Sequence, residues 1–329
     1  MLDKVHRLIT TVGEEELPDG SLVTRYRFVH ALYQNMLYAE LVSKRRILLH
    51  RQAGEQLVKL LLESYFVLGM VRGNQGRMSE ALATFGEAQE IAHRQGEQFW
   101  SPRIPNCIGW IYREMQDFER AREFDGRGLD VGRKANVLEA QANSLINLGI
   151  DYRHTGESDR TLKSFREVKD IFRRDAWFRW RYRIRLRAGQ CEHYLSTGEL
   201  AEAHERAVSL LEIATRYEAH KYIAVAHRLL ARVAAARGDD AEAARELARS
   251  LARLDAHPVP VEAWKTYAEQ GRLQERAGDR PGARESFTQA AAVITLIAEG
   301  IQDDAERRTF LDSEAVSQVL RSAGREAVP

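Results

Sequence analysis

The chain has 329 residues, of which 44% are hydrophobic and 29% are charged, and its formal net charge is +1. This composition is typical of a soluble, foldable protein and excludes a disordered chain. The near-zero net charge excludes a global attraction to nucleic acid or to an anionic membrane, so any electrostatic preference must be local.

The first 57 residues follow a different pattern from the rest of the chain. Apolar residues at helical spacing predict a short amphipathic helix at the start: Leu2, Val5, Leu8, Ile9 and Val12. The turn signal at 18–20 and the alternation after it predict a short hairpin. Two more helices are expected, at about 30–41 and from 43 into the next region. Residues 1–57 are therefore expected to form either a winged-helix-like unit or a plain N-terminal cap.

From residue 58 to 298 a motif returns six times. Its first register holds small residues at steps of 40, 40, 42, 40 and 40: Gly69, Gly109, Gly149, Cys191, Ala231 and Gly271. Seven residues after each comes the second register: Gly76, Gln116, Gly156, Gly198, Gly238 and Gly278. Twelve residues after each comes the third register: Ala81, Ala121, Thr161, Ala203, Ala243 and Ala283. This period predicts a solenoid of six stacked units.

Each unit is expected to be two antiparallel helices joined by a tight turn. Glycine at the second register suits the left-handed residue that ends a helix, and Gln116 is the exception. The acidic residue that follows in five units suits the start of the second helix. Small residues at the first and third registers let the helices approach closely, and Phe85, Phe165 and Phe287 are expected in the core.

The registers resemble the tetratricopeptide repeat, whose signature carries Leu-Gly, Tyr, Ala and Phe at these offsets. Leu148-Gly149, Tyr152 and Phe165 show it in the third unit. The usual unit has about 34 residues, so each helix here is expected to gain most of a turn. The resemblance implies an all-α, right-handed superhelical solenoid whose first helices line a concave surface.

The flanking segments resemble the sensor region of bacterial STAND-class regulatory ATPases, a region also found beside ATPase-linked cyclases and transcriptional regulators. The resemblance is carried by residues 26–32, 43–46 and 49–51, and by 301–304, 310–311 and 316–320. It implies a capping helix and tail over 299–329 and an association with an ATPase core. The sequence has no GxxxxGK[ST] loop, so the chain is expected to be the sensor portion of such a regulator or a relative that lost its ATPase core.

The concave stripe is the expected ligand site. Arginine and amide side chains dominate it, and they suit the carboxylates of a peptide or of an acidic small ligand. The residues expected there are Arg103, Asn106, Trp110, Asn143, Asn147, Arg153, Arg185, Arg228, Arg232 and Arg272. The alternative is a charged face that contacts only solvent.

An arginine-rich segment at 173–187 is the most unusual local run. Its alternation would indicate a strand, but the repeat register places it on the first helix of the fourth unit. Three interpretations are open for its arginines: pairing with neighbouring helices, contact with a protein partner, and contact with nucleic acid.

Signatures of catalysis are missing from the sequence, which has no HExxH, paired CxxC or nucleophile elbow. We therefore predict no enzymatic activity, no cofactor and no metal. Cys107 and Cys191 are expected to be buried thiols, and with no apolar signal-peptide run we expect a cytoplasmic protein without membrane contact.

The predicted function is a non-enzymatic interaction or effector-sensing module of a bacterial signalling or transcriptional regulator. Its groove would bind a protein, a peptide or a small ligand. The rival is a nucleic-acid-binding regulator that uses segment 173–187 and the N-terminal unit, and a third option is a scaffold without an effector.

Overall fold

A computed structural model describes residues 9–16, 22–28, 43–174 and 179–324. The chain divides into two compact units, Met1–Leu61 and Leu62–Pro329. The domain limits expected at 57 and 298 remain predictions.

The first unit contains an antiparallel hairpin of β1 (Ile9–Glu16) and β2 (Leu22–Phe28), paired from Ile9 opposite Phe28 to Glu16 opposite Leu22. The predicted hairpin is confirmed. The predicted amphipathic helix is wrong at its last two positions, Ile9 and Val12, because this β-branched run extends and pairs with β2. Its first three positions and the helix expected at 30–41 lie outside the described residues. A winged-helix arrangement therefore remains a prediction.

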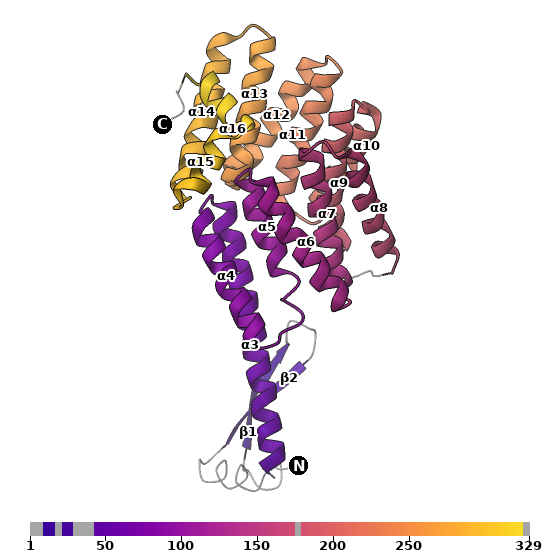
Figure 1. Cartoon of the computed structure of the whole chain (residues 1–329), viewed down its shortest axis with the longest axis vertical. Helices are drawn as coiled ribbons and strands as arrows, with labels where there is room; N and C mark the ends of the chain where they lie inside the picture. The colour runs from indigo at the N-terminus through magenta and orange to yellow at the C-terminus, as the bar shows by residue number, and fades with distance from the viewer. Residues whose placement is uncertain (1–8, 17–21, 29–42, 175–178, 325–329) are drawn as a thin grey trace. The chain divides into compact units, whose positions relative to one another are not determined.

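Six antiparallel helical hairpins follow one another in the described part of the chain (Figure 1). They are α3 (Ser43–Asn74) with α4 (Met78–Arg94), α5 (Ile104–Glu114) with α6 (Phe118–Lys134), α7 (Leu138–His154) with α8 (Ser158–Arg174), α9 (Arg179–Thr197) with α10 (Leu200–Arg216), α11 (His220–Ala236) with α12 (Asp240–Ala256), and α13 (Pro260–Arg276) with α14 (Arg280–Glu299). The predicted all-α superhelical solenoid is confirmed. Among the described helices, none is long and apolar enough to cross a bilayer.

The turns between paired helices follow the predicted chemistry. The second-register residue has a positive φ in all six, from 63° at Gln116 to 84° at Gly76. Gln116 therefore departs from glycine in type but adopts the same left-handed conformation. Asp117, Asp239 and Asp279 each accept a hydrogen bond from a backbone N–H in the first turn of the following helix. Glu199, whose side chain is longer, makes no such bond.

The small first-register residues are required by close packing within each hairpin. A Cβ atom on Gly271 would lie 2.9 Å from the ring of Phe287, closer than real contacts allow. Gly69 and Gly149 meet the rings of Phe85 and Phe165 in the same way. All three phenylalanines are buried, as predicted.

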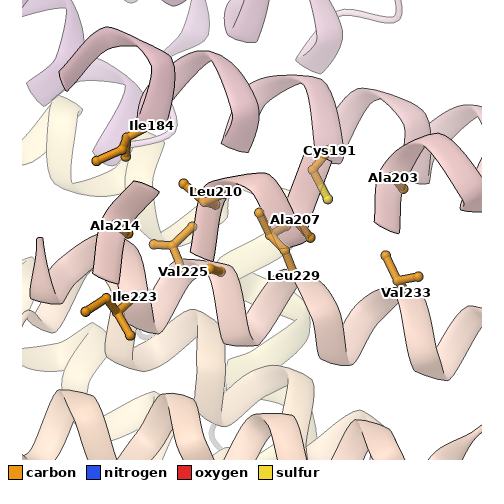
Figure 2. Packing of buried hydrophobic residues seen from close by; sticks show 11 residues of the cluster. Ile184, Cys191, Ala203, Ala207, Leu210, Ala214, Ile223, Val225, Leu229 and Val233 are labelled. Carbon is orange, nitrogen blue, oxygen red and sulfur yellow. The ribbon is translucent and has the colours of Figure 1, made fainter. Parts of the chain in front are cut away.

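Buried hydrophobic clusters join neighbouring hairpins. Figure 2 shows the cluster in which α9, α10 and α11 meet, with Leu210 and Leu229 between the helices and Cys191 beside them. Cys107 is also buried, so the prediction of two buried thiols is confirmed. Burial raises the pKa of both thiols to about 12, which keeps them protonated and unreactive.

The C-terminal cap contains two short helices, α15 (Asp304–Asp312) and α16 (Glu314–Ser322), where one was expected. Ser313 separates them because its backbone is extended, with ψ of 143°. Before the cap, the backbone N–H of Ser79 donates to the carbonyl of Gly300 (3.0 Å), and the N–H of Gln302 donates to the Ser79 hydroxyl (2.8 Å). The last hairpin therefore contacts the first, and the array closes on itself.

Replacing Gly271 with alanine tests the close approach. The added methyl group would collide with Phe287, so the free energy of unfolding should fall by about 1–3 kcal/mol in urea denaturation. The control is Gly126→Ala on α6, where a Cβ meets nothing within 4 Å. That change should stabilise by about 0.5–1 kcal/mol because alanine favours a helix. Equal effects at the two sites would contradict the packing argument.

Candidate ligand-binding cavity

A cavity of about 330 Å³ lies inside the second unit. The first helices of the second to sixth hairpins contribute to its wall, for example α5 through Trp110, α9 through Arg185 and α13 through Trp264. Ala315 of α16 also lines the cavity, so the C-terminal cap contributes to the cavity wall. The cavity therefore gathers residues that are up to about two hundred positions apart in the sequence.

The structure brings six of the ten predicted groove residues around this cavity: Trp110, Arg153, Arg185, Arg228, Arg232 and Arg272. The other four, Arg103, Asn106, Asn143 and Asn147, do not line it. Asn106 is buried and accepts a hydrogen bond from the Ser144 hydroxyl (2.8 Å), while Arg103 forms an ion pair with Glu139. These partners lie on α7. Arg103 and Asn106 thus pack against the next hairpin, whereas Arg185 and Arg228, at the same positions of later units, line the cavity.

Positive charge exceeds negative charge on the cavity wall. Eight lining side chains are arginines or lysines: Arg113, Arg153, Arg185, Lys221, Arg228, Arg232, Lys265 and Arg272. Four are carboxylates: Glu114, Glu192, Glu262 and Glu269. Buried charges are tolerated when they are paired, so the sharing of these carboxylates decides how many cations remain uncompensated.

Two carboxylates serve five of the cations. Glu262 lies 3.0 Å from Arg228 and 3.6 Å from Lys221, and Lys265 is 4.0 Å away. Glu269 lies 3.5 Å from Arg232 and 3.3 Å from Arg272. Lys265 also reaches Glu114 at 2.8 Å. This wall therefore holds more positive charge than its own carboxylates can neutralise.

Arg185 is held by neutral groups. Its guanidinium donates to the side-chain oxygens of Asn143 and Asn147, both on α7. Among the described residues no carboxylate forms an ion pair with it. Asn143 and Asn147 thus orient this arginine at the cavity without cancelling its charge.

A buried ionic cluster holds Arg113 at the cavity wall. The side chain of Arg113 donates to Asp125 (2.5 Å) on α6 and to Asp151 (2.6 Å) on α7. Asn147 donates to the other oxygen of Asp125 at 2.6 Å. Burial raises the pKa of Asp125 well above its usual value, although Arg113 opposes the shift. The cluster ties α5, α6 and α7 together with polar contacts.

The sequence held an overlooked signal for this cluster. Asp125 lies four residues after the third register, where Phe85, Phe165 and Phe287 stand in other units. A carboxylate at a core aromatic position breaks the repeat pattern, and such breaks are expected near functional or strained sites.

Lys221 and Trp264 are cavity residues that the sequence reasoning missed. Lys221 lies on the first turn of α11, ten residues before Ala231, and Trp264 lies seven before Gly271. The predicted stripe began only six residues before the register. The additional helical turn expected from a 40-residue unit supplies these positions.

The arginine-rich segment is helical from Arg179, as the repeat register required. The prediction is wrong for Arg173 and Arg174, because the second helix of the third unit, α8, extends to Arg174. Its residues divide between surfaces: Arg185 reaches the cavity, whereas Arg183 is exposed. Trp180 stacks on Tyr217 with ring centroids 4.5 Å apart, and Ile184 is buried. The interpretation as inter-helix pairing fits Arg185, although its partners are amides and not carboxylates.

The arginines of the cavity wall lower the pKa of Glu192. Burial raises this pKa, but Arg153, Arg228 and Arg232 outweigh burial and lower it from 4.5 to about 2. Arg153 donates to the Glu192 carboxylate at 2.8 Å. The ionised form of Glu192 is therefore strongly favoured in the folded protein.

Glu192→Gln should destabilise the protein by about 1–3 kcal/mol at neutral pH, because Arg153 loses its carboxylate. The folded pKa of Glu192 is below the unfolded value, so the stabilisation is present above about pH 4.5 and is lost as the pH falls toward about 2. Urea denaturation at several pH values between 7 and 3 should show that the difference in unfolding free energy between wild type and variant becomes smaller as the pH falls. The control is Glu212→Gln at an exposed position of α10. A gap that stays constant with pH would refute this assignment.

Comparisons with known proteins give one family match and several similar solved structures. The tetratricopeptide repeat family matches residues 62–93. The apo quorum sensor NprR from B. thuringiensis is 16% identical with a TM-score of 0.47, over 85% of this chain and 86% of that chain. The type IV pilus biogenesis factor PilW is 14% identical with a TM-score of 0.46, over 79% of this chain and 98% of that chain. No curated protein matches. The chain therefore contains a tetratricopeptide repeat at 62–93, within a solenoid whose other hairpins share its registers.

Proposed function

We propose that this chain is a non-enzymatic effector-sensing module of a bacterial signalling or transcriptional regulator, and that its effector enters the central cavity. Solenoids of this type serve as protein-binding scaffolds because they present extended concave surfaces. The observation that carries the proposal is the cavity, whose wall is assembled from the first helices of five hairpins. The regulator context rests on the sequence resemblance, and a cytoplasmic location rests on the two cysteines and the N-terminal composition.

The size of the cavity favours a small effector or the end of a peptide. Small-molecule sites usually measure about 300–1,000 Å³, and this cavity lies near the lower limit. Lys265 of α13 reaches Glu114 of α5, and Lys221 of α11 reaches Asn74 of α3 at 2.9 Å. A long peptide threaded through the array would have to break these contacts between early and late hairpins.

Closure of the array suggests how occupancy could be relayed. A ligand that touches both α5 and α13 gains its contacts only when the early and late hairpins stay together. It would therefore shift the population toward the closed array, since only differential affinity moves such an equilibrium. A partner that contacts both ends of the array, such as an ATPase core, could read that shift.

Filling the cavity tests the proposal. Ala188 of α9 lines the cavity and is partly buried, so Ala188→Trp should occupy ligand space. In a thermal-shift screen of small metabolites and short acidic peptides, some compounds should stabilise the wild type and lose that effect in Ala188→Trp. The control Ala244→Trp places the same side chain at an exposed position of α12 and should keep the shift. If no compound distinguishes the two variants, the effector proposal is wrong.

Nucleic-acid binding is the second candidate, and an outer group of cations favours it. Lys169 of α8, Arg183 and Arg187 of α9, and Arg206 of α10 lie close enough to influence one another. Burial, then Arg206 and Arg187, lower the pKa of Lys169. Among the described residues, none forms an ion pair with Lys169 or Arg183, and Glu205 is the ion-pair partner of Arg206. Phosphates could supply the missing negative charge.

Salt-dependent binding to random duplex DNA checks this candidate. Four phosphate contacts would weaken the affinity on the order of 100-fold between about 50 and 200 mM salt. Arg183→Gln with Arg206→Gln should reduce both the affinity and the salt slope. Arg245→Gln, which removes an exposed arginine on α12, is the control. Absence of binding at low salt would eliminate nucleic acid as the partner.

A further inference from the structure

We infer that the cavity binds a compact anion with two or more negative charges, and that Arg185 and Arg228 are its main contacts. The inference rests on the proposed function, since it names the chemistry of the ligand that the cavity would take. It concerns one site in the second unit and applies equally to a small polycarboxylate and to a small phosphate compound.

The first argument is the unsatisfied hydrogen-bonding capacity of Arg228. Its side chain is 7% exposed, and one nitrogen donates to Glu262 at 3.0 Å. Its Nε has no hydrogen-bond partner among the described residues. A buried guanidinium normally uses its donors, because leaving one unmade costs free energy. Glu262 alone therefore does not satisfy the guanidinium of Arg228, which lines the cavity.

The second argument is the orientation of Arg185. Two amide oxygens hold its guanidinium, so its position is fixed while its charge stays available. Arginine recognises carboxylates and phosphates through paired hydrogen bonds, and a pre-positioned fork binds such groups with little loss of entropy. A carboxylate partner from the protein would have competed with a ligand, and this site has none among the described residues.

The third argument is the valence of the ligand. Glu262 and Glu269 are each shared by several cations, so the deficit of negative charge is distributed over the wall from α9 to α13. A monovalent anion would compensate the cations near one point of the wall and leave the cations elsewhere on it uncompensated. An anion with two or more charged groups can contact Arg185 and Arg228 together, and the low local dielectric strengthens each contact.

The same geometry disfavours other ligands. A cationic ligand would add to an existing excess of positive charge, and a neutral ligand would leave the excess uncompensated. A long acidic peptide carries suitable charge but exceeds the space between α5 and α13, where Lys265 contacts Glu114.

Isothermal titration calorimetry on the full chain tests the inference at constant ionic strength. The probes are pyrophosphate and citrate as compact polyanions, acetate as a monovalent anion, and an acidic hexapeptide. We expect at least one polyanion to bind one site, and acetate and the hexapeptide to bind at least tenfold more weakly. The ranking of pyrophosphate against citrate separates a phosphate ligand from a carboxylate ligand.

Matched variants locate the binding. Arg185→Gln keeps the protein's carboxylate pairs intact and should weaken the polyanion about tenfold to a hundredfold. Arg228→Lys retains a charge beside Glu262, so it should fold and still lose affinity. The control Arg245→Gln removes one exposed positive charge outside the cavity and should bind like wild type.

The outcomes separate this inference from the proposed function. Equal polyanion affinity in Arg185→Gln and Arg245→Gln would overturn the inference, since the binding would then lie elsewhere on the surface. No polyanion binding, combined with a neutral compound whose effect disappears in Ala188→Trp, would also overturn it while the effector function stands. If no compound depends on Ala188, both the inference and the proposed function fall.

Discussion

Close contact between a small residue and an aromatic ring is the constraint on which this fold depends. Where Gly271 faces Phe287, no side chain can intervene, so the two helices of the hairpin lie at minimum separation. A small residue recurs at this position with a nearly constant period, and in three hairpins it meets a phenylalanine ring. Successive hairpins therefore stack with a similar rotation and the array curves. That curvature brings the first helices of five hairpins around one cavity.

The charged side chains on the cavity wall are not the residues that stability alone would favour. Arginine and lysine side chains crowd the cavity wall, and the fold retains them by sharing a few carboxylates, by amides at Arg185, and by the buried pairs of Arg113. An apolar lining of similar volume would cost less free energy. Local departures from the most stable arrangement are expected where a protein binds a ligand, and the cationic wall is such a departure.

Closure of the array changes how its hairpins depend on one another. In an open solenoid each repeat contacts only its neighbours, and stability is roughly a sum of local terms. Here Ser79 bonds to Gly300 across the array, and Glu306 of α15 accepts from Arg120 of α6 at 2.7 Å. The first and last hairpins are thereby coupled, so a perturbation in the cavity can reach both.

The sequence alone determined the hairpins, their turns and their cores. Left-handed turns, the aspartate caps and the buried phenylalanines follow from local rules repeated at one spacing, so one correct register predicts all six units. Tertiary structure decided the cavity. Whether Asn147 faces solvent or donates a hydrogen bond to Asp125, and whether Lys265 meets Glu114, depends on the curvature summed over several hairpins. A small rotation at each interface accumulates along the array, and no local pattern specifies the total. The sequence therefore predicted a cationic groove, and only the tertiary structure decided which of its residues line one cavity.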